Sequence, residues 1–123
     1  MNEHLIRKLT EKQAHRLVGF ILGIKVFEAS NHSCGDEITL QGEQAGGKIE
    51  KIVYKGSACS ICLASAEFLC QEIEGKLLSA IDTEKEKKKL LATFSMQETD
   101  KRASCALLPY RALEQLKKEL LDI

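Results

Sequence analysis

The sequence predicts an α+β fold, in which a small antiparallel sheet follows one helix and precedes several more. Residues 38–41 alternate apolar and polar side chains, and residues 48–55 are rich in Ile and Val. The glycine-rich segment 42–47 separates these two stretches, which is typical of a β-hairpin. After Gly56 the apolar spacing changes from period two to the helical period. We therefore expect one α+β domain over residues 1–123.

The first helix is expected to begin just after Thr10. Thr10-Glu11-Lys12-Gln13 matches a capping box, in which Thr10 is the N-cap and Gln13 reaches back to it. An apolar stripe at helical spacing follows, formed by Ala14, Leu17, Val18, Ile21 and Leu22. This helix is expected to end near Gly23, and residues 31–33 are expected to form a loop before the hairpin.

Further helices are expected after the hairpin. The first of them carries Ile61, Leu63 and Phe68 and ends at Gly75, a favourable residue just after a helix. Thr83 is the expected cap of the next helix, whose mixed-sign segment 84–89 predicts a solvated face. Pro109 is expected either to start the last helix or to kink it.

Composition limits the classes of function. The 123 residues include 18 Lys+Arg and 18 Asp+Glu, so the net charge is zero, which argues against nucleic-acid binding as the main activity. No apolar run approaches the roughly 20 residues that span a bilayer, so we expect no membrane association. The start of the chain does not resemble a signal peptide. The expected location is cytoplasmic, where thiols stay reduced.

Five cysteines are present, and their surroundings divide them into two groups. Cys34, Cys59 and Cys105 fall in or near expected turns or helix starts, where a thiolate can point at a shared ion. Cys62 and Cys70 fall inside an apolar helical stretch, which favours packing in the core. Because the count is odd and the expected compartment is reducing, metal or sulfur chemistry is favoured over disulfides.

Local sequence supports a shared site for the first group. If the segment after Cys34 is extended, Cys34 and Asp36 point to the same side and can reach one ion. Cys59 lies where a strand gives way to a helix, and helix N-termini stabilise thiolates. Cys105 is expected near the start of a late helix. A shared metal or sulfur site and a set of buried structural thiols both remain open on these grounds.

Cys59-Ser60-Ile61-Cys62 also matches the Cys-x2-Cys pattern of dithiol redox proteins. That interpretation requires a preceding βαβ unit, whereas a hairpin precedes it here. A small core residue is therefore the favoured role for Cys62.

Four motifs in order resemble the IscU/SufU/NifU N-terminal-domain family of iron–sulfur cluster assembly proteins, over most of the chain from about Asn31. Cys34-Gly35-Asp36 is similar to the family's Cys-Gly-Asp, and residues 55–65 are similar to its Gly-x-x-Cys helix start. Gly75-Lys76 matches the Gly-Lys that closes that helix. Residues 102–108 resemble the Arg-x-x-Cys-Ala-x-Leu of the SufU branch.

The resemblance implies a small three-stranded antiparallel sheet packed against several helices. It also implies that Cys34, Asp36, Cys59 and Cys105 bind one zinc ion or hold a nascent iron–sulfur cluster. In the SufU-like version, a cysteine desulfurase passes persulfide sulfur to a thiol, for which Cys34 is the candidate acceptor and Cys105 the alternative. The chain would then act as a scaffold or sulfur carrier that supplies recipient apo-proteins, with its rate effect belonging to the desulfurase.

Some residues depart from the family pattern. Ser104 stands where IscU-type members have histidine, which favours the SufU-like branch, but the segment between the second and third cysteines is shorter than in that branch. His32 is a candidate nitrogen ligand, with a solvated loop histidine as the alternative. Cys62 replaces a serine. Two other functions therefore stay open: a dithiol oxidoreductase using Cys59 and Cys62, and a zinc-stabilised interaction domain.

Overall fold

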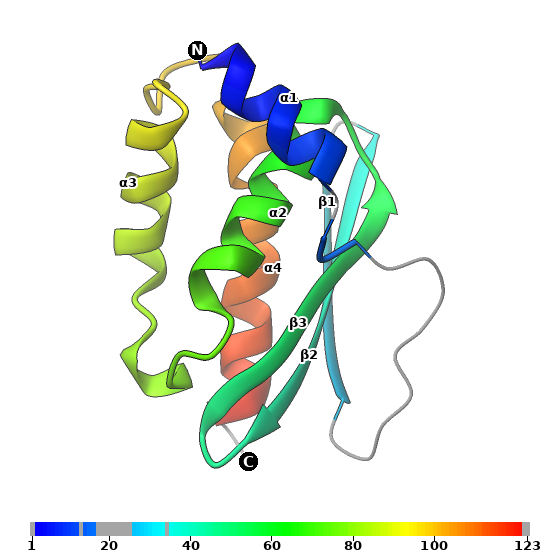
Figure 1. Ribbon diagram of the computed structural model, residues 1–123, viewed down its shortest axis with the longest axis vertical. Helices are drawn as coiled ribbons and strands as arrows, with labels where there is room; N and C mark the ends of the chain where they lie inside the picture. The colour runs from blue at the N-terminus through cyan, green and yellow to red at the C-terminus, as the bar shows by residue number, and fades with distance from the viewer. Residues whose placement is uncertain (1, 13, 17–25, 34, 122–123) are drawn as a thin grey trace.

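Three antiparallel strands form one sheet within the described part of the chain (Figure 1). The computed structural model describes residues 2–12, 14–16, 26–33 and 35–121, with the backbone alone at 26–33 and 119–121. The strands pair in the order β1-β2-β3 and are β1 (Val26–Ser33), β2 (Asp36–Ala45) and β3 (Lys48–Ser57). The register places Ser33 opposite Asp36 and Ile38 opposite Gly56.

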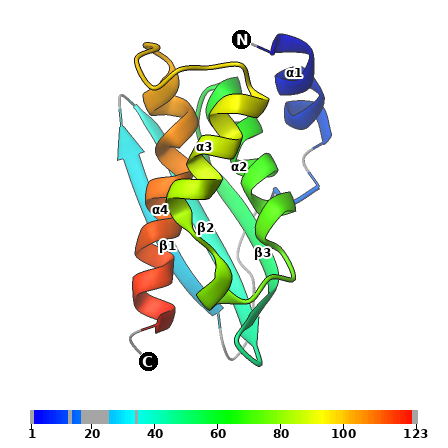
Figure 2. The same cartoon turned by 90° about the vertical axis from the view of Figure 1, so that its left-hand side faces the viewer.

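The described helices cover one face of this sheet (Figures 1 and 2). They are α1 (Glu3–Lys12), α2 (Ser60–Ile73), α3 (Thr83–Thr93) and α4 (Ala103–Leu121), with a short 3-10 turn at Leu78–Ala80. α2 and α4 pack directly on the strands, α3 packs on the outside of both helices, and α1 packs against α2. This arrangement confirms the α+β class predicted from the sequence.

The core lies between the sheet and the α2–α4 layer. α2 is covered by the sheet, α1, α3 and α4, and all its residues from Ile61 to Cys70 are buried. A helix that is apolar on nearly every side is expected in such a position. The fully buried residues include Ile38, Leu40, Tyr54, Leu69, Leu108 and Leu113.

Glycine residues with positive φ angles stand at two connections, the turn between β2 and β3 and the end of α2. Gly46 and Gly47 have positive φ angles of 59° and 79° and form the turn between β2 and β3, as a two-residue hairpin turn requires. The hairpin predicted from the sequence is thus confirmed, although its turn is shorter than the six residues expected. Gly75, with φ of 86°, directly follows the C-cap of α2, where the sequence placed the end of this helix.

The expectation for the first helix is wrong. Thr10 lies inside α1 and does not cap a later helix, and its hydroxyl donates to the carbonyl of Ile6 at 2.8 Å. Asn2 caps α1 instead, because its side-chain oxygen accepts from the backbone N–H of Leu5 at 3.2 Å. Of the expected apolar stripe, Ala14 is exposed, and the other four residues lie outside the described residues.

Three further expectations need correction. Residues 31–33 belong to β1 and not to a loop, because an edge strand tolerates polar residues that pair on one side alone. Asp82, not Thr83, caps α3, because its side chain accepts from the backbone N–H groups of Glu84 and Lys85 at 3.1 and 3.4 Å. Pro109 does not start α4, since that helix begins earlier, at Ala103, and contains the proline.

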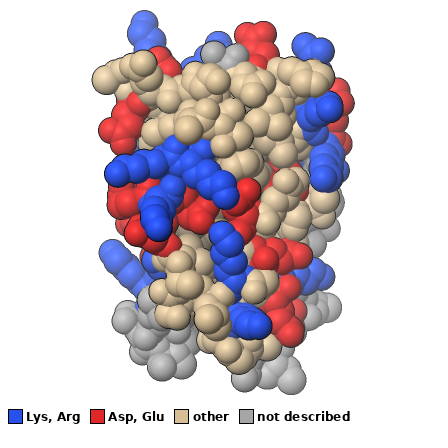
Figure 3. Space-filling view, turned by 60° about the vertical axis from the view of Figure 1, so that its left-hand side comes forward, with Lys and Arg blue, Asp and Glu red and all other residues tan. Residues whose placement is uncertain are grey.

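The side of the molecule that carries α3 mixes positive and negative side chains (Figure 3). Lys87 pairs with Glu84 at 3.3 Å, and Lys89 pairs with Glu72 of α2. The solvated face predicted for segment 84–89 is confirmed, with the exception of the buried Glu86. None of the described helices is both long and apolar enough to cross a bilayer.

Candidate metal centre

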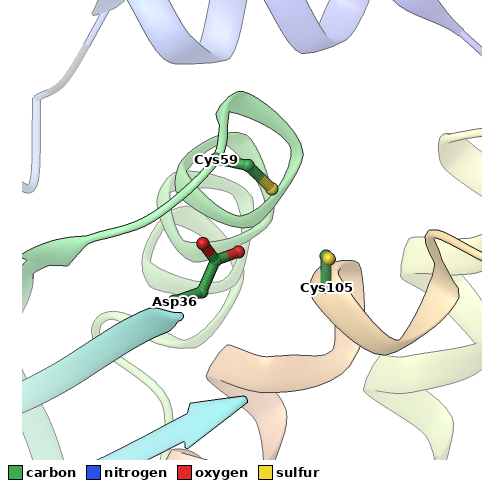
Figure 4. A group of neighbouring side chains, drawn as sticks. All are labelled: Asp36, Cys59 and Cys105. Atoms are coloured by element: carbon green, nitrogen blue, oxygen red, sulfur yellow. The ribbon is translucent and has the colours of Figure 1, made fainter. Parts of the chain in front are cut away.

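Asp36, Cys59 and Cys105 come together at one end of the sheet (Figure 4). One carboxylate oxygen and the two sulfur atoms all lie within 4.8 Å of one another. The residues are far apart in sequence: Asp36 begins β2, Cys59 directly precedes α2, and Cys105 lies in the first turn of α4. Ligands of one tetrahedral zinc ion are roughly 3.5–3.8 Å apart, given metal–ligand bonds of about 2.0–2.3 Å. Small side-chain adjustments would therefore bring these three atoms to the separations that one zinc ion requires.

The strand register places Asp36. It is the first residue of β2 and pairs with Ser33 at the end of β1. Residues two apart in a strand point to the same face, and Ile38, two residues later, is fully buried beneath the helices. Asp36 therefore faces the helical layer at the edge of the core, where it remains partly accessible.

The strand-to-helix junction places Cys59. β3 ends at Ser57, and Cys59 is the N-cap of α2, with extended backbone angles of φ −68° and ψ 165°. Its carbonyl accepts from the backbone N–H of Leu63 at 3.0 Å, which closes the first helical turn. Cys59 is exposed. An N-cap side chain projects beside the unpaired N–H groups of the helix, whose positive potential favours an anionic ligand.

Contacts between α2 and α4 place Cys105. It is the third residue of α4 and is partly exposed, as expected for a residue near the start of a late helix. The hydroxyl of the buried Ser65 on α2 donates to the carbonyl of Ala106, directly after Cys105. Pro109 lacks an N–H, so it cannot supply the helical hydrogen bond to the Cys105 carbonyl. The hydrogen bond to Ala106 thus ties this first turn of α4 to α2.

Cys59 and Cys105 border a hollow of about 340 Å³ that Ser60, Ile61 and Arg102 also line. The sequence motif contained Arg102 but gave it no role. Its position three residues before Cys105 is the signal, because the Ala106 N–H donates to the Arg102 carbonyl at 3.1 Å, so that the turn that starts α4 contains both residues. Arg102 is exposed, and its guanidinium adds a permanent positive charge to the residues that line this hollow.

The surroundings of Cys59 disfavour its charged thiolate form when no cation is present. Partial burial of its sulfur is the largest cause that raises the pKa of the thiol, although the residue as a whole is exposed. Asp36 raises this pKa further by accepting a hydrogen bond and by its charge, and so does Cys105. The backbone amide of Cys62 acts in the opposite direction. A bound metal cation would remove the repulsion among these groups.

The other sequence candidates have different positions. Cys34 and the side chain of His32 lie outside the described residues, so their proposed roles stay predictions. Cys70 is fully buried in the core, as expected for a packing residue. Cys62 is also fully buried, but the charges of Cys59, Asp36 and Cys105 raise its pKa in addition to burial. It is therefore a buried thiol close enough to the three grouped side chains to interact with their charges.

Comparison with known sequences yields one family and two curated relatives. The family described as NifU-like N terminal domain matches residues 8–119. A zinc-dependent sulfurtransferase SufU from Bacillus subtilis is 39% identical over 51 residues, which cover 42% of this chain and 35% of the relative. An iron–sulfur cluster assembly scaffold protein IscU from Streptococcus pyogenes is 33% identical over 58 residues, 47% of this chain and 36% of the relative. The chain thus aligns with about a third of each relative's length.

A solved structure extends the likeness over nearly the whole fold. The crystal structure of a protein assigned as an iron–sulfur cluster assembly scaffold for the SUF system, from Fervidobacterium islandicum AW-1, superimposes with a TM-score of 0.68. The superposition covers 92% of this chain and 93% of the other, at 25% sequence identity.

Proposed function

Because this chain belongs to the NifU-like N-terminal domain family, we propose that it takes part in iron–sulfur cluster assembly, as a cluster scaffold or as a zinc-bound sulfur acceptor. One observation carries the proposal: the convergence of Asp36, Cys59 and Cys105 within 4.8 Å. Cys34, two residues from Asp36 in sequence, is the proposed fourth ligand. Three thiolates and one carboxylate match the four donors of a tetrahedral zinc site.

The same donors suit both chemistries. Thiolates bind zinc, and they also bind the iron of a growing cluster, which is the cargo of a scaffold. Asp36 is a harder ligand than the thiolates and binds a soft site more weakly, so it is the donor that leaves first when sulfur or iron arrives. Its partial exposure at the end of β2 permits this movement.

The proposed sulfur donor is a cysteine desulfurase that carries a persulfide. A thiolate of this chain attacks the outer sulfur, the S–S bond of the donor breaks, and the donor cysteine leaves as a thiolate. The acceptor then carries the persulfide. Cys34 is the proposed acceptor, because Gly35 beside it allows a wide range of backbone angles. Cys105 is the alternative, since this residue lines the hollow through which a donor can approach.

Metal analysis tests the site. The protein is purified with and without added zinc, and its metal content is compared with Cys59→Ser, Cys105→Ser and Asp36→Ala. We expect about one zinc ion per chain in the wild type, little in either cysteine variant, and weaker binding in Asp36→Ala. Cys70→Ala is the matched control, because it removes a buried thiol of α2 away from the site. Full zinc content in both cysteine variants would rule the site out.

Sulfur transfer separates the proposed function from its competitors. The protein is incubated with a cysteine desulfurase and ³⁵S-cysteine, and label on the chain is measured without reductant. Label on Cys34 or Cys105 supports the acceptor role. Assembly of a coloured cluster from iron and sulfide without labelling supports the scaffold role. Zinc binding without either result would indicate an interaction domain that is merely stabilised by zinc.

A further inference from the structure

Two thiols of opposite exposure stand at the start of α2. Cys59 is the exposed N-cap, and Cys62, three residues later, has an exposed fraction of 0%. This is the arrangement of a dithiol pair in which an outer thiol reacts first and an inner thiol completes the reaction. The site described above uses Cys59 and leaves Cys62 without a role.

The backbone permits a direct bond between the two sulfur atoms. The hydrogen bond from the Leu63 N–H to the Cys59 carbonyl shows that the first turn of α2 is formed. Residues three apart in such a turn have Cβ atoms about 5–6 Å apart, and a disulfide requires about 3.5–4.5 Å. Because Cys59 has extended rather than helical backbone angles, it can close this gap without unwinding the helix.

We propose that Cys59 and Cys62 form a disulfide under oxidation, so that the start of α2 is a redox-sensitive modification site that competes with metal for Cys59. With hydrogen peroxide as oxidant, the exposed Cys59 thiol is converted to a sulfenic acid and one water leaves. The Cys62 sulfur then attacks the Cys59 sulfur, the S–O bond breaks, and a second water leaves. A dithiol such as dithiothreitol reverses the change by exchange.

Cys105 is the rival partner, and the geometry disfavours it. Its sulfur lies within 4.8 Å of the Cys59 sulfur, but it belongs to a different helix. A disulfide requires sulfur atoms about 2.05 Å apart. Closing that distance would shift the start of α4, which the Ser65–Ala106 hydrogen bond ties to α2. A bond to Cys62 joins residues of one turn at the start of α2, so it requires no shift of α4.

The metal and the disulfide exclude each other, because one sulfur of Cys59 cannot serve both. Oxidation would release the metal, and bound metal would protect Cys59. This competition rests on the proposed function, whereas the disulfide itself does not. With free zinc at a hundred times its dissociation constant, about 1% of sites are empty, so oxidation should be about a hundredfold slower.

Peptide mapping by mass spectrometry tests the proposal. Zinc-loaded and chelator-treated wild-type protein are each exposed to hydrogen peroxide, alkylated and digested without reductant. In the metal-free protein we expect a Cys59–Cys62 link that dithiothreitol removes. In the zinc-loaded protein we expect the link to form about a hundredfold more slowly. One zinc ion should be released to a chromogenic chelator for each link formed.

Two variants serve as controls. In Cys62→Ser, the Cys59 sulfenic acid should persist and be captured by dimedone. In Cys70→Ala, which alters the same helix farther from its start, the link should form at the wild-type rate. A link from Cys59 to any other cysteine, or no link, overturns the disulfide. If the link forms at equal rates with and without bound zinc, the proposed competition between metal and disulfide is wrong. If the protein binds no zinc at all, the proposed metal site is wrong, and the disulfide proposal is unaffected.

Discussion

Gly56 on β3 passes so close to Glu37 on β2 that no side chain fits between the two backbones. A Cβ atom on Gly56 would lie 2.0 Å from the carbonyl oxygen of Glu37, and Gly56 has a φ of +146°. Asp36 directly precedes Glu37, and Cys59 follows Gly56 by three residues. This close approach therefore helps to set the separation of two proposed ligands, Asp36 at the start of β2 and Cys59 just after the end of β3.

Replacement of Gly56 should disturb both the fold and the site. In Gly56→Ala the new methyl group must push the strands apart in a backbone conformation that alanine rarely adopts, so we expect a loss of about 3 kcal/mol or more in unfolding free energy. Zinc content should fall as well. Urea unfolding and metal analysis measure the two effects. Gly46→Ala is the control, because Gly46 also has positive φ but has no atom within 4 Å of the added Cβ. It should cost about 1 kcal/mol and keep full zinc content.

A buried carboxylate holds the N-terminal segment against α2. Glu67 has an exposed fraction of 0%, and its two oxygens lie 2.8 Å from the backbone nitrogen and 2.7 Å from the Nδ1 of His15. The other ring nitrogen of His15 lies 2.9 Å from Glu74. Gln71 also donates to Glu67 at 3.1 Å. This carboxylate therefore connects residues that follow α1 to the central helix.

Removal of the negative charge of Glu67 should lower the free energy of unfolding. Glu67→Gln keeps the volume but replaces one acceptor oxygen with an NH2 group that faces hydrogen-bond donors, so we expect a loss of about 2–4 kcal/mol in unfolding free energy. Glu72→Gln is the matched control on the same helix. Its ion pair with Lys89 is partly exposed, so it should cost less than about 1 kcal/mol. Equal effects of the two variants in urea unfolding would contradict the role given to Glu67.

The sequence predicted the elements whose patterns are strong and local. The hairpin was identifiable because Gly46 and Gly47 separate two apolar stretches, and the end of α2 because Gly75 follows it. The cap of α1 was missed, since Asn2 is fixed by contacts with the distant end of α3: its backbone N–H donates to the carbonyl of Phe94 at 2.8 Å. Such long-range contacts leave no periodic trace in the sequence.

Sequence patterns alone predicted less of the candidate site than of the fold. The separations of Cys34, Cys59 and Cys105 match no metal-binding spacing, so their grouping depended on family resemblance. The approach of Cys105 to Cys59 is produced by the packing of α4 on α2, including the Ser65 hydrogen bond, which no local pattern encodes. The burial of Cys62 was predicted, but its proximity to the charges of the site required the fold.

The proton affinity of Cys59 should respond to Asp36. Burial is the largest cause that raises the pKa of this thiol, and the carboxylate raises it further by its hydrogen bond and by its charge. Asp36→Ala should therefore lower that pKa in metal-free protein and speed alkylation of Cys59 near pH 8. Iodoacetamide labelling across pH, read by peptide mass spectrometry, gives the pKa of this one thiol. Glu37→Ala removes the adjacent, exposed carboxylate and should leave the Cys59 profile unchanged. A higher Cys59 pKa in Asp36→Ala would contradict the predicted electrostatics.

Alkaline pH should destabilise the protein partly through Cys70. Burial raises the pKa of this thiol well above its ordinary value, and the charges of Glu67 and Glu74 add to the effect. The folded state therefore keeps the proton that the unfolded chain loses above about pH 8.5. Stability due to this group is present below that pH and falls above it, by up to about 1.4 kcal/mol per pH unit. Cys70→Ala lacks this group, so its unfolding free energy should decline less steeply between pH 8.5 and 10 in metal-free urea titrations. Below pH 7.5 the two proteins should show parallel pH dependence. Parallel curves at alkaline pH as well would show that Cys70 does not retain its proton.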